Sequence, residues 1–166
     1  MFELGIMMVL PAALAFAGAM DLLTMTIPNR ISLTLLAGFC LAAPLAGFSL
    51  ETFGMHLAAG ALILAVGIVL FSFGLFGGGD AKLMAAASVW IGFDHLLTFF
   101  VDIALLGGVL AVILLLYRRL PVAVFPSQPW AWRLHSNDIG MPYGLAIAGA
   151  GLYLYPHTEI FKALVL

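Results

Sequence analysis

The chain has 166 residues, of which 64% are hydrophobic and only 8% are charged, and its mean hydropathy is +1.19. Soluble domains carry roughly 25% charged residues, so this composition excludes an ordinary soluble domain and indicates a membrane protein. The net charge of −2 excludes nothing further, whereas the single cysteine, Cys40, excludes an internal disulfide and a cysteine metal cage.

Six apolar segments follow one another along the chain, and we expect an all-α fold in which each of them crosses the membrane once. The first lacks the basic start of a signal peptide and carries Glu3, so we read it as a retained span. The fourth is short, because the 14 residues from Asp80 to Phe93 make only about 21 Å of helix. Residues 1–166 are expected to form a single integral-membrane domain. The expected spans are 4–23, 31–48, 54–76, 81–92, 96–117 and 139–156.

The basic residues predict the orientation of these spans. With six spans, five of the six Lys and Arg residues fall on one side, and only Lys162 falls on the other. The positive-inside rule makes the first side cytoplasmic and puts both termini on the non-cytoplasmic side. A five-span arrangement with a re-entrant fourth segment would scatter these charges. The five residues on the expected cytoplasmic side are Arg30, Lys82, Arg118, Arg119 and Arg133.

Three aspartates lie in or beside the apolar segments, where a carboxylate costs about 2.5–3.5 kcal/mol near the centre of a span. Asp21 ends the first segment and Asp80 precedes the fourth, at matching depth on the expected cytoplasmic side. Asp102 lies in the fifth segment toward the outer side, and we expect it to be structural. Asp138, at the start of the last segment, is expected to cap that helix.

Asp21 and Asp80 are therefore the candidates for a carboxylate pair. Two carboxylates brought close share one proton and titrate as a unit. The ionised partner can take a proton from water while the protonated partner polarises a carbonyl, as in aspartic proteases. Spacing alone allows a proton relay or an ion site equally well.

Three glycines, Gly77, Gly78 and Gly79, stand directly before Asp80. We expect them to adopt backbone angles that other residues resist, to break the helix at the membrane edge and to let a substrate backbone come close. The N–H groups at the start of the next helix are expected to stabilise the ionised form of Asp80. A phosphate-binding loop is not indicated, because its GxxxxGK[ST] pattern is absent.

Three motifs together resemble those of the type IV prepilin peptidases. "GGGDAKLMAA" (77–86) resembles the family's GxGD motif, with a lysine two positions after the aspartate, and "DLLTMTIPNR" (21–30) resembles its first aspartate motif. "MPYGLAIAGAG" (141–151) resembles its last span. The short chain is similar to the branch that processes Flp-type (tight adherence) pilins.

The resemblance implies an aspartic endopeptidase of the cytoplasmic (inner) membrane that cuts the short leader from prepilins, with Asp21 and Asp80 as catalytic residues. It implies no cofactor and no metal. The expected partners are the prepilin substrate and the lipid bilayer, with no nucleic acid. Larger members insert a cytoplasmic domain with paired CxxC motifs and also N-methylate the new pilin N-terminus. Here the first junction is tight, so we expect cleavage without methylation.

Further residues are expected to shape the site or to contact substrate. Pro28 and Asn29 are also expected to end the first helix and turn the chain, with Asn29 or Ser32 capping the second span. The position of Tyr143 fits an aromatic anchor at the membrane–water interface as well as it fits a residue that lines the site. Small residues of the last segment, including Gly144 and Ala148, are expected to pack helices. The full set of expected site-shaping residues is Gly77, Gly78, Gly79, Lys82, Pro28, Asn29 and Tyr143.

Three alternatives stay open at this point. Among enzymes, the chain fits a peptidase for preflagellins or for other signal or intramembrane substrates. From another class, it fits a proton-coupled membrane transporter that uses Asp21 and Asp80 as relay carboxylates, although we see neither the internal repeats nor the additional spans that transporters often have. The last alternative is a non-catalytic subunit of a pilus-assembly machine, which would tolerate the loss of either carboxylate.

Overall fold

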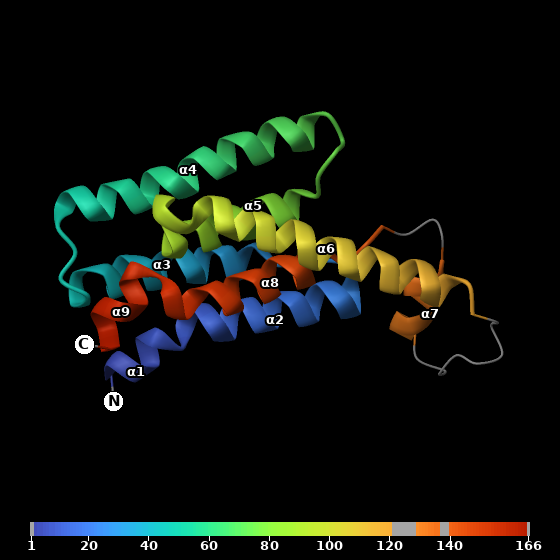
Figure 1. Ribbon diagram of the computed structural model, residues 1–166, viewed down its shortest axis with the longest axis horizontal. Helices are drawn as coiled ribbons and strands as arrows, with labels where there is room; N and C mark the ends of the chain where they lie inside the picture. The colour runs from blue at the N-terminus through green and yellow to red at the C-terminus, as the bar shows by residue number, and fades with distance from the viewer. Residues whose placement is uncertain (1, 121–128, 137–139, 166) are drawn as a thin grey trace.

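The computed structural model describes residues 2–120, 129–136 and 140–165; Asp138, expected to cap the last helix, lies outside them. Over the described ranges every regular element is helical, which confirms the all-α expectation for them (Figure 1). The helices are α1 (Phe2–Met7), α2 (Val9–Thr24), α3 (Asn29–Leu45), α4 (Leu50–Ser72), α5 (Gly78–Ile91), α6 (Leu96–Arg118), α7 (Pro129–His135), α8 (Tyr143–Leu154) and α9 (Glu159–Val165). Short 3-10 turns lie at Phe93–His95 and Tyr155–His157.

The long helices run back and forth along one bundle, and α5 lies at its centre (Figure 1). Helices α3, α4 and α8 all pack against α5. Ten of the 14 residues of α5 are buried, and the indole N–H of Trp90 donates a hydrogen bond to the Leu35 carbonyl at 2.8 Å. The short fourth segment is therefore surrounded by protein, which explains how a helix of this length is accommodated in an apolar bundle.

Apolar side chains cover the outer faces of α4 and α6. Val69 of α4 is 53% exposed, and Leu105 and Val109 of α6 are 64% and 57% exposed. A monomeric soluble protein rarely exposes so much contiguous apolar surface. These faces fit contact with lipid tails.

In the described part of the chain, three helical stretches are long and apolar enough to cross a membrane: Gly5–Thr24, Leu50–Ser72 and Phe93–Arg118. The other three expected spans correspond to shorter helices, with 17 residues in α3, 14 in α5 and 12 in α8. Helix α8 is shorter than the expected sixth span, 139–156, because Pro142 precedes it and Pro156 lies in the 3-10 turn that follows it. Proline has no N–H group for the helical ladder.

The two ends of the bundle differ in charge. The N- and C-termini lie together at one end, next to α9, which carries Lys162 (Figure 1). The opposite end holds the C-termini of α2 and α6, the N-termini of α3 and α5, and α7. The five basic residues of the expected cytoplasmic side belong to these segments.

The charge asymmetry leads to a prediction about topology. Reporter fusions after residues 30, 82 and 125 are expected to be cytoplasmic, and fusions near residue 51 and after residue 160 are expected to lie outside, because basic loops stay on the cytoplasmic side. The measurement is the activity of a reporter that works in one compartment only. A cytoplasmic C-terminus would contradict the six-span arrangement.

Candidate active site

Asp21 lies near the C-terminus of α2 and is only 6% exposed. Helix α8 packs along α2, and the Gly144 N–H donates a hydrogen bond to Asp21 Oδ2 at 2.7 Å. Gly144 is the second residue of α8, where backbone N–H groups have no partner within the helix. The positive end of α8 therefore faces the Asp21 carboxylate, which favours a negative charge there.

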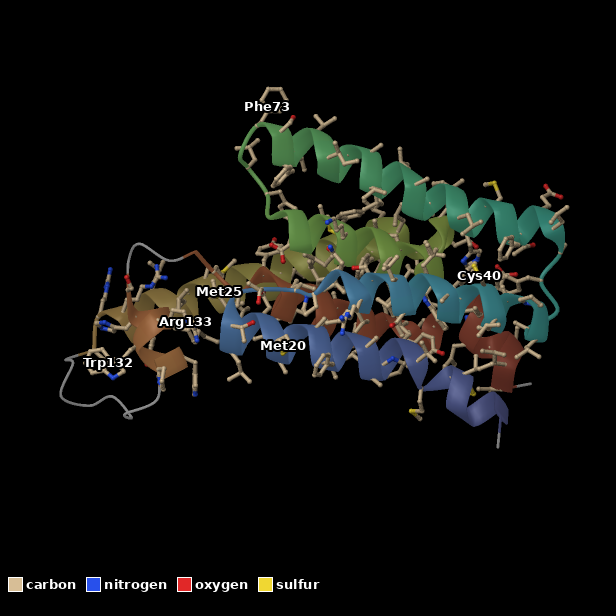
Figure 2. The ribbon with its side chains drawn as sticks, turned by 180° about the vertical axis from the view of Figure 1, so that it is seen from behind. Met20, Met25, Cys40, Phe73, Trp132 and Arg133 are labelled. Atoms are coloured by element: carbon tan, nitrogen blue, oxygen red, sulfur yellow. The ribbon has the colours of Figure 1, made fainter. Side chains whose placement is uncertain are left out.

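Helix α2 ends at Met25, its C-cap residue. The sequence had instead suggested that Pro28 and Asn29 end this helix. Met25 has a φ of 56°, and its N–H donates to the Asp21 carbonyl. This left-handed conformation is unfavourable for a residue with a side chain, and it ends the helix one turn after Asp21. Figure 2 shows Met25 at this end of the bundle, where Arg133 of α7 also lies.

The capping prediction for the second span was also wrong. Pro28 is the N-cap residue of α3 and offers no side-chain hydrogen bond. Asn29 is the first residue of the helix, and its Oδ1 accepts a hydrogen bond from Lys82 Nζ at 3.0 Å. The Ser32 hydroxyl is buried without a hydrogen-bond partner among the described residues. Asn29 therefore joins α3 to α5 and does not cap its own helix.

Asp80 lies in the first turn of α5 and is partly buried. Its carboxyl group is close enough to Asp21 for the two to interact electrostatically. Asp102 is on α6, where its Oδ2 is buried without a hydrogen-bond partner in the described part of the chain. The structure thus places Asp21 and Asp80 within electrostatic range of each other, and the catalytic roles that the sequence predicts for them stay predictions.

The glycines before Asp80 have a different role from the expected one. Gly77 has ordinary extended angles (φ −72°, ψ 136°), and Gly78 and Gly79 belong to the first turn of α5. The glycine that reverses the chain is Gly74, with a φ of 70°, which ends α4. The Gly74 N–H bonds to Phe71 O and the following N–H to Leu70 O, the arrangement of a Schellman cap.

Close approach explains why Gly77, Gly78 and Gly79 lack side chains. A Cβ on Gly77 would lie 2.6 Å from Asp80 Oδ2, which is too close for any real contact. A Cβ on Gly78 would lie 3.3 Å from the Phe71 ring, and one on Gly79 would lie 3.3 Å from Ile27 Cβ. These glycines leave room for the carboxylate and for the α2–α3 connection.

Tyr143 begins α8, directly before Gly144. Its ring meets Phe76 edge to face with the centroids 5.8 Å apart. On the other side it packs so closely on Gly107 of α6 that a Cβ there would lie 2.9 Å from the ring. Tyr143, at the start of α8, therefore packs against both α6 and the α4–α5 connection, next to the Gly144 that bonds to Asp21.

Sequence reasoning missed three residues of this region. Gly144 was assigned to helix packing, although its position just after Pro142, at a helix start on the same side as two aspartates, was an available signal. Ile27 packs between Gly144 and Gly79 and so links the surroundings of both aspartates. Arg133 donates a hydrogen bond to the Leu23 carbonyl near the end of α2, which no local pattern indicated.

Helix packing by small residues is confirmed between α2 and α8. Gly18 of α2 faces Ala148 of α8 so closely that a Cβ added to Gly18 would lie 3.1 Å from Ala148 Cβ.

Among the residues that the structure describes, no group of three or more His, Cys, Asp or Glu side chains is arranged to hold a metal ion.

The family model for the type IV leader peptidase family matches residues 8–112. The chain belongs to the type IV leader peptidase family. The matched segment includes both Asp21 and Asp80, and it ends before α8, so the contribution of Gly144 comes from the structure alone. Neither a search of curated proteins nor one of solved structures gave a match. Family membership implies that this leader peptidase is a hydrolase of peptide bonds, and its apolar helices indicate that it resides in a membrane.

Proposed function

We propose that this leader peptidase removes the short leader from Flp-type prepilins at the cytoplasmic face of the inner membrane, using Asp21 and Asp80 to activate water. The observation that carries the proposal is the electrostatic interaction between Asp21, near the C-terminus of α2, and Asp80, in the first turn of α5, at the basic end of an apolar bundle. A substrate with a cytoplasmic leader and a membrane-embedded apolar helix presents its cleavage site at this depth.

The surroundings of the two carboxyl groups suggest different roles. Both aspartates lie at a helix N-terminus, but among the described residues only the Asp21 carboxylate accepts a hydrogen bond there, from the Gly144 N–H, which supports a negative charge on Asp21. We assign the ionised state to Asp21, which takes a proton from the attacking water. Asp80 holds the shared proton and donates it to the scissile carbonyl oxygen as the water oxygen bonds to the carbonyl carbon. The tetrahedral gem-diol then returns one hydroxyl proton to Asp80 as its C–N bond breaks, and the proton on Asp21 passes to the leaving amine.

The direct test is incubation of the purified protein, in detergent or in lipid vesicles, with a Flp-type prepilin. We expect a shorter pilin on an immunoblot, and N-terminal sequencing should show a single cut between leader and apolar helix. Intact prepilin together with a proton flux across the vesicle membrane would instead support a transporter. Cleavage of a preflagellin but not of a prepilin would support the alternative that the protein is a preflagellin peptidase.

The tight connection between the first helices gives a second expected result. Only residues 25–28 separate α2 from α3, so this junction has no inserted domain like that of the methylating members. Pilin matured by the purified protein in the presence of S-adenosylmethionine should therefore carry a free N-terminal amine in the mass spectrum. A mass increase of one methyl group would refute this expectation.

A further inference from the structure

A groove of about 510 Å³ lies between α3 and α4, with α5 as its floor. Both flanking helices pack on α5, and Figure 1 shows α4 as the outermost helix on this side of the bundle. The walls are apolar and include Leu36, Leu64 and Val89. Leu36 and Leu64 remain 39% and 38% exposed, so the described protein does not fill the groove.

The groove runs parallel to the three helices that form it. Its lining extends from Asn29 to Leu36 on α3, from Leu57 to Leu64 on α4 and from Lys82 to Val89 on α5. Each of these stretches rises by about 10 Å, or two helical turns. A straight apolar groove of this length, flanked by two helices and opening toward the apolar surroundings, has the shape for another helix.

The end of the groove nearest the aspartates is polar. Lys82 is exposed at this end of the groove; within the described residues one of its three N–H donors bonds to Asn29, and two remain for a further acceptor. The Ser32 hydroxyl lines the same end and is buried without a partner within the described ranges. Buried polar groups are nearly always hydrogen-bonded, and the positive charge of an exposed lysine at the end of an apolar groove attracts an anion. The two groups together suit a carboxylate.

This polar end adjoins the candidate active site. Lys82 and Asp80 both lie in the first turns of α5, about 3 Å apart along the helix axis. Asn29 follows the connection in which Ile27 packs against Gly79. A helix that occupies the groove with its first turn at Lys82 therefore brings the preceding residues close to the aspartates.

We propose that the groove binds the apolar helix of the prepilin that follows the scissile bond, with Lys82 and Ser32 receiving an acidic side chain in its first turns. The proposal rests on the prepilin peptidase function proposed above. The site selects substrates by two features: an apolar helix that fills two turns of the groove, and a carboxylate that pairs with Lys82.

A charge exchange tests the pairing. The probes are synthetic prepilins with a basic leader and an apolar helix that carries Glu, Gln or Lys at each of its first eight positions in turn. At one position we expect the wild type to prefer Glu over Gln by roughly tenfold in kcat/KM, mostly through KM. Lys82→Met should lose this preference, and Lys82→Glu should prefer Lys at the same position. A merely structural lysine would show no such exchange, and equal cleavage of all substrates by all three proteins would overturn the pairing.

Photo-crosslinking tests the groove itself. A benzoylphenylalanine in place of Leu36 or Leu64 should form a covalent adduct with a bound prepilin, whereas one in place of Ala104, an exposed residue of α6, should not. Adducts with lipid alone at the groove positions, or equal prepilin adducts at Ala104, would overturn the proposal. If the wild type cleaves these prepilins but both tests give the contrary result, only the groove fails. If it cleaves none of them, the proposed function fails as well.

Discussion

Asp21→Asn and Asp80→Asn are each expected to leave prepilin uncut, with kcat lowered by roughly 10²- to 10⁴-fold. Asparagine keeps the size of the side chain but can neither accept nor deliver the shared proton. The Gly144 N–H can still donate to the amide oxygen at position 21, so the fold around α2 and α8 should persist. The measurement is the shift from precursor to mature pilin on an immunoblot, with the membrane level of each variant checked alongside.

The double variant sharpens this prediction. Residues that act as a unit are not additive, so losing both aspartates should cost little more than losing one. The matched control is Asp102→Asn, which removes a carboxylate from α6 and should retain cleavage. Normal maturation by either of the first two variants, or its loss only in the Asp102 variant, would show that the wrong carboxylates have been paired.

Gly144→Ala is expected to reduce cleavage by about 10²-fold, because small displacements of a catalytic group have large effects on rate. The new methyl group would lie 2.9 Å from Asp21 Oδ2 and 2.7 Å from Ile27 Cδ1. Both distances are too short, and Asp21 Cβ lies at 3.0 Å, so the Asp21 side chain must shift together with the end of the Ile27 side chain. Alanine favours a helix over glycine by about 1 kcal/mol, so the loss should occur in a protein that still folds.

The control for this variant is Gly149→Ala on the same helix. There the added methyl group meets only Leu106 Cδ1, at 3.1 Å, the end of a flexible side chain. Cleavage should be nearly unchanged, and the thermal stability of both variants should be close to that of the wild type. Full activity of Gly144→Ala would mean that Asp21 does not depend on the start of α8.

Hydropathy and charge along the chain were sufficient to predict the membrane class, the apolar segments and the basic end, because these are local properties of the sequence. The motifs around Asp21 and Asp80 were sufficient for the family, which the family model confirms. The sequence also placed Asp21 and Asp80 on the same side, since they end and begin an apolar segment there, and their pairing as catalytic residues stays a prediction.

The supporting contacts depend on residues that are distant in sequence. The Gly144–Asp21 hydrogen bond joins positions 123 residues apart, and the Lys82–Asn29 bond joins positions 53 residues apart. No periodicity encodes such contacts, because they arise only when α8 and α3 dock on their neighbours. The groove between α3 and α4 likewise depends on how both helices rest on α5.

The glycines before Asp80 illustrate the same division. From the sequence alone, Gly77 is compatible both with an unusual backbone angle and with a close contact, since the absence of Cβ permits either. In the folded chain the backbone angle is ordinary, and the Asp80 carboxylate occupies the space that a Cβ would need. Composition therefore determined where this protein resides and which residue types it offers for chemistry. Only the packing of its helices decided which backbone groups surround the two carboxylates, because that depends on distances between segments and not on their order.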